Sequence, residues 1–379
     1  MKPYLLVAGD FVKTGGMDAA NHALASYLAD TGNQVHLVAL RVAQDLASRS
    51  NVTVHRIPKP ANSYILAEPL LDRTGRRWAR RLARAGGRVV VNGGNCQWGD
   101  ANWLHYVHAA YRPQTERRVS GRLKGWLSHR LFMAGERAAL RRARIVIANS
   151  NRTRQDAIDR LGLPAARVRR VYYGVDADTF RPVSAEERAA ARAALAWPEN
   201  RPYVAFIGAL GDRRKGFDTL FTAWRMLCAN PRWDADLVVI GSGSELPNWK
   251  IRSAAARLES RIRFLGFRDD VPFVLAACDA LVAPAHYEAY GRAAQEALCR
   301  GLPAFVTRSA GVAEHYPVEL HDLLMPDACQ PAEMAARLRA WRESIDGYRD
   351  AVAPLSRTLR AHTWKRMASQ IVELIESAA

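Results

Sequence analysis

At 379 residues with 49% hydrophobic and 24% charged side chains, the chain has the size of two globular domains and a composition that argues against disorder. Its net charge of +18 is uneven, because residues 1–185 hold 30 Lys and Arg against 13 Asp and Glu, whereas residues 186–379 hold 25 against 24. The five cysteines form no Cys-x-x-Cys pair, which argues against a disulfide framework or a zinc site and favours a cytoplasmic protein. No stretch of the sequence approaches the length of about 18 apolar residues that a membrane-spanning helix needs.

Strand-like and helix-like stretches alternate along the first half of the chain, which predicts a parallel sheet. The first apolar run ends at Asp10 and is too short for a secretory signal. The expected strands are 4–8, 35–40, 89–91, 145–148 and 168–172, and the expected helices include 17–29 and 153–161. Gly15 and Gly16 lie between the first strand and the first helix, where missing side chains let backbone amides approach an anion. A tight turn is the plainer explanation of this glycine pair.

Two basic stretches in this half have helical spacing. One spans residues 73–84, and the other spans residues 117–144, where arginines alternate with apolar side chains (Trp126, Leu127, Leu131, Phe132 and Met133). Basic residues beside an apolar stripe are typical of a helix on an anionic membrane surface. An arginine-rich proteome and a solvated helix face are the alternatives. Nucleic-acid binding is not expected, because no zinc finger, RNP-like motif or helix-turn-helix accompanies the charge.

Two histidines, His105 and His108, follow a strand-like run in the first half. At the end of a strand, either imidazole could bond a sugar hydroxyl or orient an acceptor. A histidine whose nitrogens are satisfied inside the core is the alternative reading for each.

The alternation restarts after a polar, Ala- and Arg-rich connection between Pro182 and Pro202. The expected strands are 203–207, 237–240, 262–265, 280–283 and 304–306, and the expected helices are 217–228, 246–258 and 291–300. We therefore expect an α/β protein of two Rossmann-like, doubly wound domains, 1–180 and 181–362, facing a central cleft. The last helix, within 363–379, is expected to pack back onto the first domain.

The loop after strand 203–207 places Arg213, Arg214 and Lys215 directly before Gly216 and a helix. Cations at a helix N-terminus that follows a strand suit a diphosphate. The Walker pattern is absent, so ATP hydrolysis is not expected.

Two further patterns are less informative. Asp176-Ala-Asp178 and Asp234-Ala-Asp236 spell a metal-binding Asp-x-Asp, yet neither is expected at the carboxyl end of a strand, so no metal site is predicted. Gly241-Ser-Gly243 lacks the third glycine of the dinucleotide fingerprint, so it is interpreted as a strand-to-helix turn that lines the cleft.

Glu288 and Glu296 lie eight positions apart, the first in a loop after strand 280–283 and the second within a helix. Along a helix this spacing gives about 12 Å, more than the roughly 5–9.5 Å between the carboxylates that hydrolyse glycosides. Two acids that hold separate hydroxyl-rich parts of one ligand fit better, with the amides of Tyr290, Gly291 and Arg292 meeting a phosphate between them. A capping Glu followed by an ordinary surface Glu is the alternative from spacing alone.

Taken together, several motifs resemble the family 4 glycosyltransferases, which have the GT-B fold. They are Glu288-x7-Glu296, Ile207-Gly-x6-Lys215-Gly216, Tyr173-Gly-Val-Asp176, Ile147-Ala-Asn-Ser150 and the early Gly15-Gly16, and they span nearly the whole chain in the family's order. The resemblance implies metal-independent transfer of a sugar from a nucleotide donor with retention of its anomeric configuration.

Carried over by position, the resemblance implies that Glu288 faces the donor sugar, Glu296 the ribose hydroxyls and Lys215 the diphosphate. Gly16 would approach the donor from the other domain, and His108 would lie near the donor sugar and the attacking hydroxyl.

One position departs from the family pattern, because Ala209 stands where many members carry an arginine. Arg213 or Arg214 would have to supply that charge, and the sequence leaves the choice between them open.

The expected partners are a nucleoside-diphosphate sugar and a glycan or lipid-linked acceptor, presented at the anionic inner face of the plasma membrane to a peripherally bound enzyme. No cofactor, metal or nucleic acid is expected. A nucleotide-sugar epimerase or another GT-B enzyme such as a phosphorylase is the alternative.

Overall fold

The computed structural model describes residues 2–111, 119–211 and 213–378, and for residues 119–124 and 127 the backbone alone. The described residues form two compact units: unit 1 holds residues 2–111, 119–174 and 362–378, and unit 2 holds residues 175–211 and 213–361. The chain leaves unit 1 after Gly174, a few residues before the expected boundary at 180, and returns to it at His362.

Unit 1 is built on a parallel sheet with the strand order β5-β3-β1-β6-β7-β8-β9. Its inner strands are mostly apolar and mostly buried, as expected when helices cover both faces of a parallel sheet. The strands are β1 (Pro3–Val7), β3 (Gln34–Ala39), β5 (Val52–Arg56), β6 (Arg88–Asn92), β7 (Ala101–Leu104), β8 (Ile145–Ala148) and β9 (Val168–Arg170). Two short strands, β2 (Asp10–Phe11) and β4 (Arg41–Val42), pair with each other.

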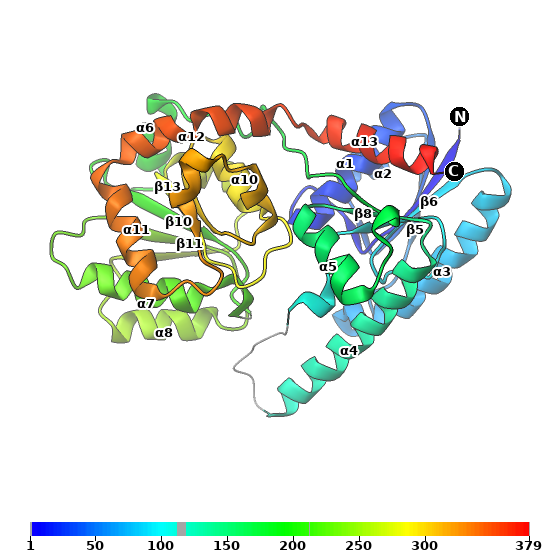
Figure 1. Cartoon of the computed structure of the whole chain (residues 1–379), viewed down its shortest axis with the longest axis horizontal. Coiled ribbons are helices and arrows are strands. Elements are labelled where there is room, and N and C mark those ends of the chain that lie inside the picture. Colours follow the sequence, from blue (N-terminus) through cyan, green and yellow to red (C-terminus); the bar gives the residue numbers. More distant parts are fainter. Residues whose placement is uncertain (1, 112–118, 212, 379) are drawn as a thin grey trace. The chain divides into compact units, whose positions relative to one another are not determined.

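The helices of unit 1 include one from the end of the chain. They are α1 (Gly16–Asp30), α2 (Gln44–Ala47), α3 (Tyr64–Arg84), α4 (Val119–Arg142), α5 (Asn151–Leu161) and α13 (Trp364–Ser377). α13 packs against α1, red beside blue in Figure 1. Its Glu376 accepts hydrogen bonds from Lys2 Nζ at 2.5 Å, Tyr4 Oη at 2.7 Å and Arg88 Nε at 3.3 Å. Burial acts to raise the pKa of Glu376, but these donors outweigh it and lower the pKa to about 2.

Unit 2 is built on a second parallel sheet, with the order β12-β11-β10-β13-β14-β15. Its strands are β10 (Tyr203–Ile207), β11 (Asp236–Ile240), β12 (Ile262–Gly266), β13 (Ala280–Ala283), β14 (Ala304–Thr307) and β15 (Leu324–Met325). Its helices are α6 (Ala185–Ala194), α7 (Phe217–Cys228), α8 (Leu246–Ala255), α9 (Val271–Ala276), α10 (Arg292–Cys299), α11 (Pro331–Glu343) and α12 (Ile345–Arg360).

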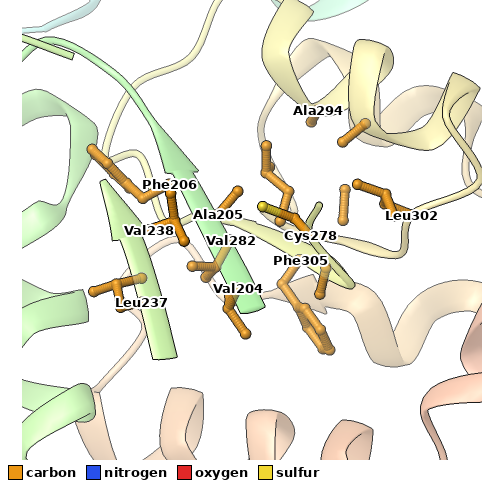
Figure 2. Close-up of a cluster of buried hydrophobic side chains, with 14 of the residues drawn as sticks. Val204, Ala205, Phe206, Leu237, Val238, Cys278, Val282, Ala294, Leu302 and Phe305 are labelled. Atoms are coloured by element: carbon orange, nitrogen blue, oxygen red, sulfur yellow. The ribbon is translucent and has the colours of Figure 1, made fainter. Parts of the chain in front are cut away.

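The core of unit 2 lies between its sheet and the helices around it. Figure 2 shows side chains of β10, β11, β13 and β14, such as Val204, Leu237, Val282 and Phe305, gathered with Ala294 of α10. The prediction of two doubly wound parallel-sheet domains is confirmed. None of the helices formed by the described residues is both long and apolar enough to cross a bilayer.

Candidate functional site

The strand order of unit 2 indicates at which edge of its sheet a ligand would bind. The chain proceeds from β10 to β11 and β12 on one side, then crosses to β13, β14 and β15 on the other. β10 and β13 pair in parallel, so the loops that follow them leave the same edge of the sheet side by side. Ligands of doubly wound sheets bind at such a switch point. The two loops carry the basic residues 213–215 and the segment 284–291.

Gly216 lies where these two loops come into close contact. It precedes α7 with φ at 71°, and a Cβ there would overlap the carbonyl oxygen of Pro284, the residue after β13. His286 N–H donates to the Arg214 carbonyl at 2.8 Å. Since both the left-handed backbone and the close approach require glycine, the sequence at this position fixes how the basic loop meets the next one.

Lys215 and Glu288 form an ion pair across the two loops. Their side chains are 21% and 18% exposed. Burial acts to raise the pKa of Glu288, but the ammonium of Lys215 and the guanidinium of Arg214 outweigh it and hold the pKa below its ordinary value. The stem of Lys215 passes over Gly208, where a Cβ would lie 3.2 Å from Lys215 Cγ. The structure therefore brings together two residues, 73 positions apart, that the sequence assigned to one ligand.

The structure distinguishes the two arginines that are candidates to supply the positive charge that Ala209 lacks. Arg214 Nη1 donates to the Tyr287 carbonyl at 3.4 Å, next to Glu288, whose pKa it helps to lower. Arg213 Nε lies 4.0 Å from Asp218 Oδ2 instead. Of the two, Arg214 is therefore the cation beside Glu288.

The N-terminus of α10 lies between the two glutamates. Gly291 precedes the helix with φ at 105°, and a Cβ there would lie 2.8 Å from Val312 Cγ1. Tyr290 is only 2% exposed and its carbonyl accepts from Val312 N–H, so its side chain is enclosed by the protein.

Glu296, one turn into α10, is 7% exposed and pairs with Arg292 at 2.6 Å. Burial raises the pKa of Glu296 above its ordinary value, and Arg292 offsets this only in part. The two carboxylates thus sit in different electrostatic environments, which fits separate tasks better than a shared proton transfer.

The remaining predicted residues belong to unit 1. Gly15 precedes α1 with φ at 82°, and a Cβ on it would lie 3.1 Å from Asp18 Oδ2. A Cβ on Gly16 would meet nothing within 4 Å, so protein packing does not require a glycine there.

The two histidines differ. His105 is 5% exposed, its Nδ1 bonds the Tyr173 hydroxyl, and burial lowers its pKa to about 3. His105 is therefore a core histidine, but only its Nδ1 is satisfied, because its buried Nε2 has no hydrogen-bond partner among the described residues. The His108 side chain is 15% exposed and its Nδ1 lies 2.9 Å from Glu136 Oε1. Sequence reasoning missed Glu136, although it is the single acidic residue within the basic stretch 119–142.

The Asp-x-Asp patterns have structural partners. Asp236 is fully buried and pairs with Arg201, Arg261 and Arg263 (3.0, 2.9 and 3.4 Å), while Asp234 pairs with Arg342 at 2.6 Å.

Three other sequence motifs can be placed in part. Asp176 accepts from the backbone of Asp178 and Thr179. Gly241 and Gly243 form the turn after β11, where a Cβ on either would overlap the β10–α7 loop. Of the basic stretch 117–144, residues 117 and 118 and the Leu127 side chain lie outside what the structure describes.

Comparison with known proteins agrees with this architecture. Residues 14–179 match the family model described as Glycosyltransferase Family 4, and residues 187–350 match that described as Glycosyl transferases group 1, so the two models together cover most of the chain. The chain belongs to the family 4 glycosyltransferases.

Curated relatives of this glycosyltransferase include the 2-deoxystreptamine N-acetyl-D-glucosaminyltransferase of Streptomyces fradiae, 32% identical over 58% of this chain and 51% of that protein. The D-inositol 3-phosphate glycosyltransferase of Salinispora tropica is 26% identical over 89% of this chain and 82% of that protein. Against several such relatives, the chain spans little more than half of their length.

Solved structures resemble the glycosyltransferase over its whole length. Sucrose-phosphate synthase from Thermosynechococcus elongatus has a TM-score of 0.79 at 20% identity, covering 100% of this chain and 99% of that one. HepE from Anabaena, in complex with UDP and glucose, has a TM-score of 0.74 at 19% identity, covering 100% of both chains. These likenesses concern the fold, and the fold is GT-B, as predicted.

Proposed function

We propose that this protein transfers a sugar from a nucleoside-diphosphate sugar to a hydroxyl acceptor, with retention of anomeric configuration and without a metal ion. The observation that carries the proposal is the meeting of Lys215, Arg214 and the α10 N-terminus around Glu288 at the switch point of unit 2. Two cations and a helix N-terminus suit a diphosphate, and flanking carboxylates suit sugar hydroxyls. HepE, which shares the fold, binds UDP and glucose.

The residues divide the donor between them in this proposal. Lys215 and Arg214 stabilise the charge that develops on the departing nucleoside diphosphate, which supplies most of the rate enhancement. Glu288 bonds hydroxyls of the donor sugar, and its ion pair holds Lys215 in place. Glu296 accepts hydrogen bonds from the ribose. His108 and Gly16 act from unit 1, and the acceptor hydroxyl attacks the face that the leaving group vacates.

A thermal-shift panel of nucleoside diphosphates and their sugars tests the proposal, because a ligand that binds only the folded state raises the melting temperature. We expect selective stabilisation by one base, lost in Lys215→Ala and Glu288→Ala, and donor turnover lost in the same two variants. Wild-type turnover in either variant would contradict the assignment. A lysine-bound pyridoxal cofactor absorbing visible light would indicate a phosphorylase instead, and interconversion of two nucleotide sugars an epimerase.

We further propose that the acceptor is anionic or lipid-linked and is met at an anionic membrane surface by α3. Exposed residues three or four positions apart follow one line of this helix, first apolar and then basic: Leu66, Leu70, Arg73, Arg77, Arg81 and Arg84. Leu66 is 53% exposed and Leu70 is 37% exposed. Apolar side chains beside a row of arginines suit lipid tails beside anionic headgroups. One relative is named D-inositol 3-phosphate glycosyltransferase, after a compound that carries an anionic phosphate.

Co-sedimentation with vesicles of phosphatidylglycerol and phosphatidylcholine tests this surface. We expect binding to anionic vesicles at low salt, its loss at high salt because exposed charges are screened, and its loss in Arg73→Glu/Arg77→Glu. The matched control is Arg225→Glu/Arg252→Glu, which reverses two exposed arginines of unit 2. Binding that ignores both lipid charge and salt would contradict the proposal.

A further inference from the structure

His108 is held at two atoms by one buried carboxylate, that of Glu136 in α4. Glu136 Oε1 lies 2.9 Å from the ring Nδ1, and Glu136 Oε2 accepts from the backbone N–H of His108 at 3.1 Å. Glu136 is 1% exposed. Because one carboxylate binds both the main chain and the ring of the same residue, it fixes the rotation of the imidazole as well as its position.

The carboxylate itself is fixed by the packing of α4 against the loop after β6. A Cβ on Gly94 would lie 3.0 Å from Glu136 N, so only glycine lets the two backbones come this close. Gln97 Nε2 donates to the carbonyl of Gly135 at 2.8 Å. Two contacts from one loop therefore fix the position of Glu136. No other residue of the proposed site accounts for a buried acid at this place.

This arrangement selects one tautomer of His108. An ionised carboxylate only accepts hydrogen bonds, so the proton of the neutral ring lies on Nδ1 and the lone pair lies on Nε2. The Tyr106 hydroxyl lies 3.1 Å from Nε2, where it can donate an O–H hydrogen bond to that lone pair. Phe132 stacks on the ring at a centroid distance of 5.6 Å.

We propose that Glu136 is a positioning residue for glycosyl transfer, which holds His108 as the Nδ1-protonated tautomer so that Nε2 accepts a hydrogen bond from a substrate hydroxyl. The inference rests on the proposed function, in which His108 meets the sugar. The substrate hydroxyl takes the position at Nε2 that the Tyr106 hydroxyl marks here. Glu136 acts only through His108, so its loss affects turnover more than donor affinity.

The substitution Glu136→Gln tests the inference, because the amide fills the same space but carries no charge and has one acceptor oxygen for the two donors of His108, Nδ1–H and the backbone N–H. We expect kcat to fall about 10- to 100-fold, the usual range for a residue that orients a functional histidine, with little change in the donor KM. Glu136→Asp keeps a carboxylate and should recover part of the loss. His108→Ala/Glu136→Gln should be no slower than His108→Ala alone, since the two residues act as a unit.

The pH profile supplies a readout that a purely structural role would not move. The acidic limb of kcat should move to lower pH in Glu136→Gln, because the variant lacks the negative charge beside the imidazole. The other titratable groups facing His108 are Tyr106, His129 at a ring-centroid distance of 5.9 Å, and Glu68 of α3, and all three remain in the variant.

The matched control is Asp156→Asn, which removes another buried carboxylate of unit 1 that pairs with Arg152 and Arg160 on α5. We expect it to lower stability but to leave the pH profile and kcat unchanged. An equal shift of the profile in both variants, or an unchanged kcat in Glu136→Gln, would overturn the inference.

The tautomer can be read without any activity, from two-bond proton–nitrogen NMR spectra of the histidine rings. The wild type should show His108 protonated at Nδ1 alone, and a proton on Nε2 would overturn the inference even if Glu136→Gln does not fold. Failure of the wild type to turn over any nucleotide sugar would instead overturn the proposed function, so the two failures are distinguishable.

Discussion

Replacing Lys215 with methionine tests the ion pair in the proposed phosphate site, because methionine keeps most of the apolar stem and removes the charge. Removing one partner of an ion pair lowers the free energy of unfolding by about 3–5 kcal/mol when the pair is fully buried and by about 0–1 kcal/mol when it is exposed. Since the Lys215 and Glu288 side chains are 21% and 18% exposed, we expect a loss of about 2 kcal/mol in the free energy of unfolding at neutral pH.

The loss should depend on pH. In the wild type the pKa of Glu288 is lowered, so its stabilisation is present above its unfolded pKa and disappears as the pH falls. In Lys215→Met, burial raises the pKa of Glu288 and only Arg214 opposes this rise. Glu288 can therefore take up a proton in acid, which removes the cost of burying its charge. Urea unfolding at pH 8 and pH 5 should therefore give a smaller difference between the two proteins at the lower pH.

Turnover should fall further than stability. A preorganised group that stabilises transition-state charge contributes about 100- to 1000-fold in kcat, so Lys215→Met should lose at least that factor with the donor that the thermal-shift panel identifies. The control is Lys250→Met, an exposed lysine of α8 in the same unit. Equal initial rates for Lys215→Met and Lys250→Met would refute the proposed role of the ion pair.

Three further substitutions have defined outcomes. Gly216→Ala should lose about 2 kcal/mol or more in urea unfolding, from a left-handed backbone and a clash with a carbonyl, whereas Gly162→Ala, with φ at 68° and open space around it, should lose only about 1 kcal/mol. Glu376→Gln should cost about 1–3 kcal/mol at pH 7, and this difference should shrink below about pH 4.5 and vanish below about pH 2 as the wild-type carboxylate protonates; the exposed Glu373→Gln should change little, and an equal loss in both would contradict the anchoring of α13. Glu296→Gln should weaken nucleoside-diphosphate binding about tenfold in calorimetry with stability nearly unchanged, and unaltered binding would exclude the ribose role.

The alternation of apolar strands and helices was sufficient to predict the two doubly wound sheets, because parallel strands buried on both faces carry continuous apolar runs. The meeting of Lys215 with Glu288 was also predictable. Each follows a strand of the same sheet, and the carboxyl ends of paired parallel strands lie at one edge. Which arginine lies beside Glu288 depended on side-chain direction within the loop, which the sequence does not specify.

Other features required the structure. β5 and β15 were not predicted, since β5 is a short edge strand with exposed positions and β15 has only two residues. His105 and His108 are three positions apart in one segment, and only the packing around them separates a core histidine from a partly exposed one. The contact of His108 with Glu136 depends on how α4 packs against the loop after β6, so spacing along the chain gave no signal for it.

The measurement that tests the central proposal most directly is the configuration of the product. The purified protein is incubated with the α-linked nucleotide sugar that stabilises it and an acceptor, with a chelator present, and the anomeric proton of the product is followed by NMR. The proposal predicts release of the nucleoside diphosphate and an α-linked product. A β-linked product, a requirement for added metal, or no transfer from any nucleotide sugar would contradict it.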